Sequence, residues 1–167
     1  MTTEGTTEGT TELTIGPVGP ADVADALALL RAQLDEHAIP VSESELRRSI
    51  DELFVRPHLG VVLLARGGAG GEALGLAFVN FAWTPEIGGL AGWLDELYVR
   101  PEQRGAGLGT RLLEAAIATC RAHGCRAVDL QVEPSHARAA NLYMRRGFTE
   151  LARRTFRLDL RGGDDNG

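Results

Sequence analysis

The stretch LDELYVRPEQRGAGLG, residues 94–109, decides the fold class that this sequence predicts. It begins inside an apolar segment, residues 92–99, that has the length and composition of a β-strand. Residues 101–107 interrupt that pattern with proline and glycine, and apolar residues at helical spacing follow over 108–123. A further strand is expected over 126–133. A strand, loop, helix and strand in this order imply a parallel strand pair joined by a right-handed crossover.

The segments on either side of this unit predict the remaining elements. Further strands are expected at residues 13–18, 60–66, 73–82, 147–151 and 154–160, and further helices at 20–37, 42–57 and 135–146. Ser42 and Glu45 are spaced as a capping box, Ser135 is expected to cap the last helix, and Gly124 is expected to end the helix before it. The prediction is an α/β (mixed α+β) fold. Its largely antiparallel seven-stranded sheet carries helices on both faces, in the order βααβββαβαββ.

The length of 167 residues predicts one domain. Residues 1–12 form a polar repeat and are predicted to be a disordered tail, residues 13–160 the single domain, and residues 161–167 a second disordered tail. The first residues lack a basic start and an apolar stretch, and no apolar run approaches the roughly 20 residues that a membrane span needs. A cytoplasmic protein without membrane contact is therefore expected.

Composition excludes several classes of function. The chain contains no lysine, which excludes a Walker A phosphate site and a pyridoxal Schiff base. The net charge of −6 argues against a nucleic-acid partner and is compatible with attraction of a cationic amine. Cys120 and Cys125 match no zinc spacing, so no metal is expected.

The glycine-rich loop at residues 104–109 predicts a phosphate or pyrophosphate site. A loop between a strand and a helix presents several backbone N–H groups at the helix N-terminus, and glycine lets a bulky anion approach them. Arg104 adds a permanent positive charge. A dinucleotide fold is a weaker interpretation, because the spacing is G-x-G-x-G and Asp129 lies in the middle of the following strand. A plain glycine turn stays open as an alternative.

Two motifs in this chain resemble those of the GNAT superfamily of N-acetyltransferases. The family carries Arg/Gln-x-x-Gly-x-Gly/Ala after a strand that ends in valine, and this chain matches at Arg104, Gly107 and Gly109. The family's second motif, Ala-x-x-x-Tyr-x-x-x-Gly-Phe, matches at Ala139, Tyr143, Gly147 and Phe148. The resemblance covers residues 13–160, and it implies the GNAT fold, splayed between strands four and five.

The resemblance implies an acetyl-CoA site. The main chains of Leu97 and Val99 would hold the pantetheine arm, and one of their N–H groups would polarise the thioester carbonyl. His136 stands where the family often has an asparagine that contacts CoA. The full set of implied cofactor-binding residues is Leu97, Tyr98, Val99, Arg104, Gly105, Ala106, Gly107, Leu108, Gly109, Thr110 and His136.

The resemblance also assigns catalytic residues. Tyr143 maps to the proposed general acid, which would protonate the leaving CoA thiolate. The general base is expected at Glu96, with Asp95 as the alternative, and a regular strand would turn these neighbours to opposite faces. An expected bulge leaves open which of them faces the acceptor. Asp35, Glu36 and His37 end the first helix near the family's acceptor pocket, and they are interpreted as a solvated helix end.

The predicted function is direct transfer of an acetyl group from acetyl-CoA to a primary amine. The acidic charge and the Asp95–Glu96 pair favour a small cationic amine, such as a polyamine, an aminoglycoside or an amino acid. A protein N-acetyltransferase and a catalytically silent CoA-binding module are the alternatives. A homodimer is expected from the resemblance.

Overall fold

The computed structural model describes residues 12–67 and 71–161, which fall into two compact units divided after Gln131. The predicted tails at 1–12 and 161–167, apart from Glu12 and Arg161, lie outside the described residues, as do residues 68–70 of the first glycine turn. The first unit contains β1 (Leu13–Pro17), η1 (Pro20–Asp22), α1 (Val23–Glu36), α2 (Glu43–Val55), β2 (Gly60–Gly67), β3 (Ala73–Thr84), β4 (Gly89–Val99), η2 (Pro101–Gln103), α3 (Leu108–Ala122) and β5 (Ala127–Leu130). The second contains α4 (Ala137–Arg145). In the described ranges, no helix has the length and apolarity to cross a membrane.

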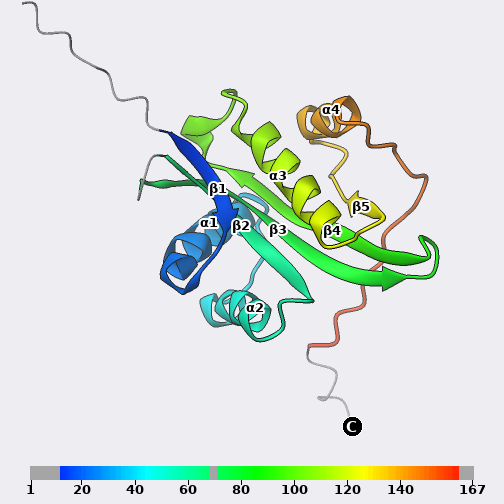
Figure 1. Ribbon diagram of the computed structural model, residues 1–167, viewed down its shortest axis with the longest axis horizontal. Helices are drawn as coiled ribbons and strands as arrows, with labels where there is room; N and C mark the ends of the chain where they lie inside the picture. Colours follow the sequence, from blue (N-terminus) through cyan, green and yellow to red (C-terminus); the bar gives the residue numbers. More distant parts are fainter. Residues whose placement is uncertain (1–11, 68–70, 162–167) are drawn as a thin grey trace, which may run out of the picture. The chain divides into compact units, whose positions relative to one another are not determined.

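The sheet of the first unit has five strands in the order β1-β2-β3-β4-β5 (Figure 1). Strands β1 to β4 pair antiparallel, whereas β5 pairs parallel to β4 after the crossover through α3. The parallel pair covers only Ala91–Leu94 of β4, opposite Ala127–Leu130 of β5. Strand β4 therefore runs beyond its partner, as far as Val99.

The predicted seven-stranded sheet, with its order βααβββαβαββ, is wrong in its last two strands. Residues 148–160 form no strand in the described part of the chain. Phe156, Leu158 and Leu160 alternate as in a half-buried strand, yet they are 82%, 83% and 82% exposed. Alternation shows which side chains would share a face, but a strand also needs a hydrogen-bonded neighbour, which the pattern does not report.

Helices cover both faces of this sheet. On one face, Leu29 of α1 and Ile50 of α2 share a buried cluster with Tyr98 of β4. On the other face, α3 packs closely, because a Cβ on Gly92 of β4 would lie 2.4 Å from the Cys120 sulfur. A side chain at position 92 would thus face α3, and this distinguishes the two faces of β4.

Local signals place most helix ends. The predicted capping box of α2 is present, since Ser42 accepts from the Glu45 N–H and the Glu45 side chain accepts from the Ser42 N–H. Gly124 follows α3 at φ +78°, as predicted for a glycine at this end. The prediction that Ser135 caps α4 is wrong, because the N-cap is His136 and it makes no side-chain cap bond.

Helix α1 is anchored to the sheet at its beginning. Arg66 of β2 donates from Nη2 to Asp22 at 2.7 Å and to Asp25 at 2.6 Å. These charged contacts hold the first turn of α1 over β2, so the last turns of the helix extend over β4. Those last turns meet the residues that the sequence predicts to be functional.

Candidate functional site

A β-bulge in β4 sets the direction of the two candidate bases. Phe78 of β3 lies opposite Glu96, while the next residue, Val79, lies opposite Leu94, so Asp95 is the extra residue of the bulge. The bulge that the resemblance implies is therefore present, and the opposite facing expected of a regular strand does not apply to Asp95 and Glu96. The alternation on which it rests stops at the extra residue.

Both carboxylates lie on the face of β4 that carries α1. The Cβ position of Gly92 points toward α3, and successive residues of a strand point to opposite faces. The indole of the next residue, Trp93, therefore lies on the α1 side. Its Nε1–H donates to Asp95 Oδ1 at 3.3 Å, which keeps the Asp95 carboxylate on that side. Glu96 Oε2 accepts a 2.6 Å hydrogen bond from Gln33 Nε2 of α1. The bulge thus gathers an indole and two acids on one face.

Glu96 is the more enclosed of the two acids. Burial raises its pKa above the ordinary value, and the Asp95 charge adds to this rise. The Gln33 hydrogen bond and the charge of His37 act in the opposite direction. A carboxyl group with a raised pKa ionises closer to neutral pH, which suits a group that accepts a proton and later releases it.

Glu36 joins the end of α1 to the glycine loop. Its carboxylate accepts from Arg104 Nη2 at 2.7 and 2.9 Å and from the Tyr98 hydroxyl at 3.3 Å. The Arg104 guanidinium also lies 5.5 Å from the centre of the Tyr98 ring, and its Nε donates to the Val99 carbonyl. Glu36 is exposed, as expected for a solvated helix end, and its carboxylate is also ion-paired with Arg104.

Two glycines of the loop have left-handed backbone conformations. Gly105 and Gly107 adopt φ values of +88° and +85°, a region that side chains with a Cβ rarely enter. Gly107 is the N-cap of α3, and the first helical bond runs from the Arg111 N–H to the Gly107 carbonyl. The N–H groups of residues 108–110 precede that bond and have no partner within the helix. These N–H groups lie at the positive end of a 15-residue helix, where an anion is favoured.

The main chain of β4 leads into this loop with one edge open. Arg100 N–H donates to the Leu74 carbonyl of β3, and in an antiparallel pair the bonded positions alternate. Leu97 and Val99 are therefore the positions whose N–H and C=O groups point away from β3, toward the β5 side. Pairing with β5 has already ended at Leu94. An extended arm with amide groups fits this edge at Leu97 and at the Val99 N–H, because the Val99 carbonyl already accepts from Arg104 Nε. A pyrophosphate fits the loop that follows.

In the second unit, the chain around Tyr143 forms a Schellman helix end. Phe148 N–H donates to the Tyr143 carbonyl at 3.1 Å, and Gly147 N–H donates to the Met144 carbonyl at 3.0 Å. Gly147 has φ +87°, and the Tyr143 and Phe148 rings meet edge to face at 5.7 Å. The spacing Tyr-x-x-x-Gly-Phe is thus also the signature of a capped helix whose last turn holds the tyrosine ring.

The predicted residues are divided between the two units. Asp95 to Val99 and Arg104 to Thr110 lie along β4 and the start of α3 in the first unit, whereas His136 and Tyr143 belong to α4 and its N-cap in the second. Sequence reasoning did not find Gln33. Its spacing of three residues from Glu36 puts both on one face of α1, and that was the available signal.

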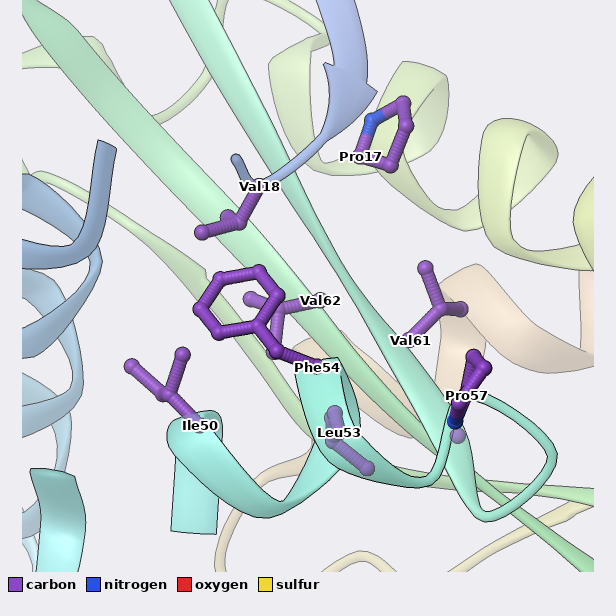
Figure 2. Close-up of a pocket in the computed structure, with 9 residues that line it drawn as sticks. Pro17, Val18, Ile50, Leu53, Phe54, Pro57, Val61 and Val62 are labelled. Atoms are coloured by element: carbon purple, nitrogen blue, oxygen red, sulfur yellow. The ribbon is translucent and has the colours of Figure 1, made fainter. Parts of the chain in front are cut away.

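An apolar cavity of about 180 Å³ lies elsewhere in the first unit, between α2 and β2 (Figure 2). Figure 2 shows the Phe54 ring beside Val18 and Val62, with Ile50 at the same wall. Its lining residues are apolar side chains and a glycine, so it offers no acid, base or anion site. The two candidate bases lie elsewhere, on β4.

Comparisons with known proteins agree with this geometry. The family model described as "Acetyltransferase (GNAT) family" matches residues 26–148. The chain is 38% identical over 157 residues to an aminoglycoside N(6′)-acetyltransferase type 1 of Stenotrophomonas maltophilia, covering 88% of this chain and 94% of that protein. It is 37% identical over 94 residues to an L-methionine sulfoximine/L-methionine sulfone acetyltransferase of Pseudomonas paraeruginosa, covering 56% of this chain.

The second of these matches spans 54% of the relative, so the chain matches about half of that protein's length. Among solved structures, an integron cassette protein from the mobile metagenome of Cole Harbour Salt Marsh superposes with a TM-score of 0.75 and 27% identity. That superposition covers 87% of this chain and 90% of the other.

Proposed function

The chain belongs to the acetyltransferase (GNAT) family, and on that premise we propose that it transfers an acetyl group from acetyl-CoA directly to the primary amine of a small cationic molecule. One observation carries the proposal. The edge of β4 at Leu97 and Val99, which β5 does not pair, leads through η2 and the glycine loop to the N–H groups at the start of α3. A ligand with an extended amide arm and a pyrophosphate matches that sequence of groups.

The residues proposed to hold the cofactor follow this edge. Leu97 and Val99 offer main-chain groups to the pantetheine arm, beside Tyr98, and the loop residues Gly105, Ala106, Gly107, Leu108, Gly109 and Thr110 offer N–H groups to the pyrophosphate. Arg104 adds its charge there, and His136 is assigned a hydrogen bond to the same cofactor. When bound, acetyl-CoA supplies a thioester whose acetyl carbon the amine attacks. The N–H of Leu97 or Val99 polarises that carbonyl as an oxyanion donor.

Glu96 is the proposed general base. An aliphatic amine is mostly protonated at neutral pH, and it must lose a proton before it can attack. The Glu96 carboxylate accepts this proton, directly or through one water, and its raised pKa brings it nearer the pH at which it works. Asp95 is the alternative base. Beside the Trp93 indole, its exposed carboxylate also attracts a cationic substrate.

Tyr143 is the proposed general acid. Burial raises the pKa of its hydroxyl, so the group stays protonated at neutral pH and can donate to the leaving thiolate. The Schellman end of α4 and the Phe148 ring restrict the orientation of the tyrosine. The second proton that the amine nitrogen loses after attack replaces the one that Tyr143 gives to the thiolate, so a direct transfer needs only these two proton-transfer groups and no covalent enzyme intermediate.

The acceptor class rests on charge and on relatives. Asp95, Glu96 and Trp93 on one face suit a small cation, and two of the relatives are named for aminoglycoside and methionine sulfoximine acetyltransferase activities. A protein N-acetyltransferase and a silent CoA-binding module remain the alternatives. The proposal includes a cytoplasmic homodimer that uses no metal and binds neither nucleic acid nor membrane.

Thiol release tests the proposal. The protein is incubated with acetyl-CoA and a panel of polyamines, aminoglycosides, amino acids and peptide N-termini. We expect turnover on a small cationic amine, and Tyr143→Phe should lower kcat by about 100-fold while the melting temperature and the Kd for CoA stay close to wild type. Turnover on peptides alone would favour a protein N-acetyltransferase, and binding of acetyl-CoA without turnover a silent module. Binding of NAD or ATP but not CoA would overturn the proposal.

A further inference from the structure

A hydrogen bond between Gln33 and Glu96 connects helix α1 to the proposed base. Gln33 Nε2 donates to Glu96 Oε2 at 2.6 Å, across 63 residues of sequence, and both side chains are partly buried. We infer that Gln33 is the positioning residue of the base: it holds one carboxylate oxygen of Glu96 in a fixed hydrogen bond and leaves the other to take the proton of the amine. This inference rests on the proposed function, in which Glu96 is the base.

Such a donor matters because two features of the site favour the neutral acid. Burial and the neighbouring Asp95 charge both disfavour ionised Glu96. A protonated Glu96 cannot accept the substrate proton. An N–H that donates to the carboxylate favours the charged form and restores the base.

An uncharged donor suits this role better than a cation. An arginine at this position would form an ion pair and hold the Glu96 pKa low, so that the carboxylate would be a poor proton acceptor. The Gln33 amide donates without a charge. It therefore keeps Glu96 ionised between turnovers and still allows it to be protonated during one.

The groups around Glu96 limit what else can set its ionisation. His37 of α1 contributes a favourable charge, and Asp95 of β4 an unfavourable one. Phe78 is the residue opposite on β3, and it carries no charge. Glu36, one turn beyond Gln33 on α1, is engaged by Arg104 and Tyr98. Of these groups of the described first unit, Gln33 is therefore the one that donates a hydrogen bond to Glu96 without carrying a charge.

The geometry is fixed before substrate arrives. Arg66 holds the first turn of α1, and the Glu36–Arg104 contact holds its last turn. Gln33 lies between these two anchors, so its amide stays within reach of Glu96. A base that is held in one orientation loses little rotational freedom on reaching the transition state.

A carboxyl titration tests the inference without any knowledge of the acceptor. Protein labelled with ¹³C at the glutamate δ-carbon is titrated by NMR, and Glu96→Gln assigns the Glu96 signal. Gln33→Met keeps the side-chain length and removes the donor. We expect the Glu96 midpoint to rise by about one pH unit, since a hydrogen bond to a charged group is worth about that much. Gln103→Met, the same change away from Glu96, should leave the midpoint in place.

The pH dependence of kcat/KM is measured with the same amine, the best of the panel, for all variants. The ionisation of the amine then affects every profile equally. Gln33→Met should move the acidic limb of the kcat/KM profile to higher pH by the same amount, with activity recovered above the limb. Glu96→Gln should lower kcat by about 100-fold at every pH.

Three results would overturn the inference, and they are distinguishable. An unchanged or lowered Glu96 midpoint in Gln33→Met removes the electrostatic role, whatever the activity. A raised midpoint with an unshifted kinetic limb, in an enzyme that Glu96→Gln inactivates, shows that Gln33 does not act through the base. Full activity in Glu96→Gln removes the proposed base itself, and the inference with it.

Discussion

The glycine loop and the α1–β4 face build neighbouring halves of the site by opposite means. The loop, residues 104–109, offers main-chain N–H groups whose directions follow from two glycines at positive φ. The α1–β4 face, made by Gln33, Glu36, Asp95 and Glu96, offers side chains from two elements that meet only in the folded chain. The first half depends on local backbone shape and the second on packing. Substitutions should therefore act on the two halves in different ways.

The largest effect is expected in the loop. A Cβ on Gly107 would meet no heavy atom within 4 Å, so a side chain there projects into open space where the pyrophosphate is proposed to lie. Gly107→Val should weaken CoA binding by about 100-fold or more, because a clash of roughly 3 kcal/mol corresponds to that factor. Isothermal titration with CoA measures this change.

Gly124→Val is the matched control. Gly124 has φ +78°, also faces open space, and lies at the opposite end of α3. Both variants should lose about 1–2 kcal/mol of stability through the left-handed backbone, but only the change at Gly107 should affect CoA. Equal CoA affinities in the two variants would show that the pyrophosphate does not bind at the loop.

The contrast between the halves also explains what the sequence could predict. Glycines between a strand and a helix are enough to predict an anion site, because the N–H directions depend on neighbouring residues alone. The same holds for the glycine helix ends at Gly124 and Gly147. Each of these features is encoded within a few residues of the place where it acts.

The α1–β4 face could not be predicted in this way. The residues around Asp95 do not by themselves mark the bulge, which only the resemblance implied, since the extra residue exists only relative to its pairing with Phe78 and Val79. The Gln33–Glu96 bond joins residues 63 positions apart and depends on how α1 lies on the sheet. The last two predicted strands failed for the same reason, because alternation at Phe156, Leu158 and Leu160 does not supply a partner strand.

A smaller effect is expected where the two halves meet, at Arg104. Its guanidinium contacts Glu36, yet the resemblance assigns its charge to the pyrophosphate. If the anion competes with Glu36, then Glu36→Gln should tighten CoA binding by about threefold, in line with an exposed ion pair of up to about 1 kcal/mol. The gain should disappear in the Arg104→Gln background.

Glu102→Gln is the control for that cycle, since it removes the same charge from the neighbouring η2 turn, where Glu102 is exposed. Its effect on the CoA dissociation constant should be smaller than that of Glu36→Gln and should persist without Arg104. Equal effects of the two variants would mean that general charge, not competition for Arg104, governs the change. The Arg104–Glu36 contact would then have no influence on CoA binding.

The smallest effect concerns the backbone at the end of α1. Ala38 has φ +52° and occupies the position that glycine takes after α3 and α4, with the Ile39 N–H bonded to the Leu34 carbonyl at 2.9 Å. A left-handed alanine costs about 1–2 kcal/mol, and glycine in the unfolded chain offsets about 0.5–1 kcal/mol of the gain. Ala38→Gly should therefore stabilise the protein by about 0.5 kcal/mol, or roughly 1–2 °C in melting temperature.

That small gain separates local backbone strain from the packing of the α1–β4 face. The Ala38 N–H donates to the Asp35 carbonyl, and Asp35 is not a proposed catalytic group. The kcat and KM should therefore stay within about twofold of wild type if α1 is held by its side-chain contacts. Calorimetry and the thiol-release assay measure both quantities on the same sample. A lower melting temperature would show that Ala38 is not strained. A higher one with lost activity would show that this left-handed turn, and not Gln33 and Glu36, sets the position of α1 over β4.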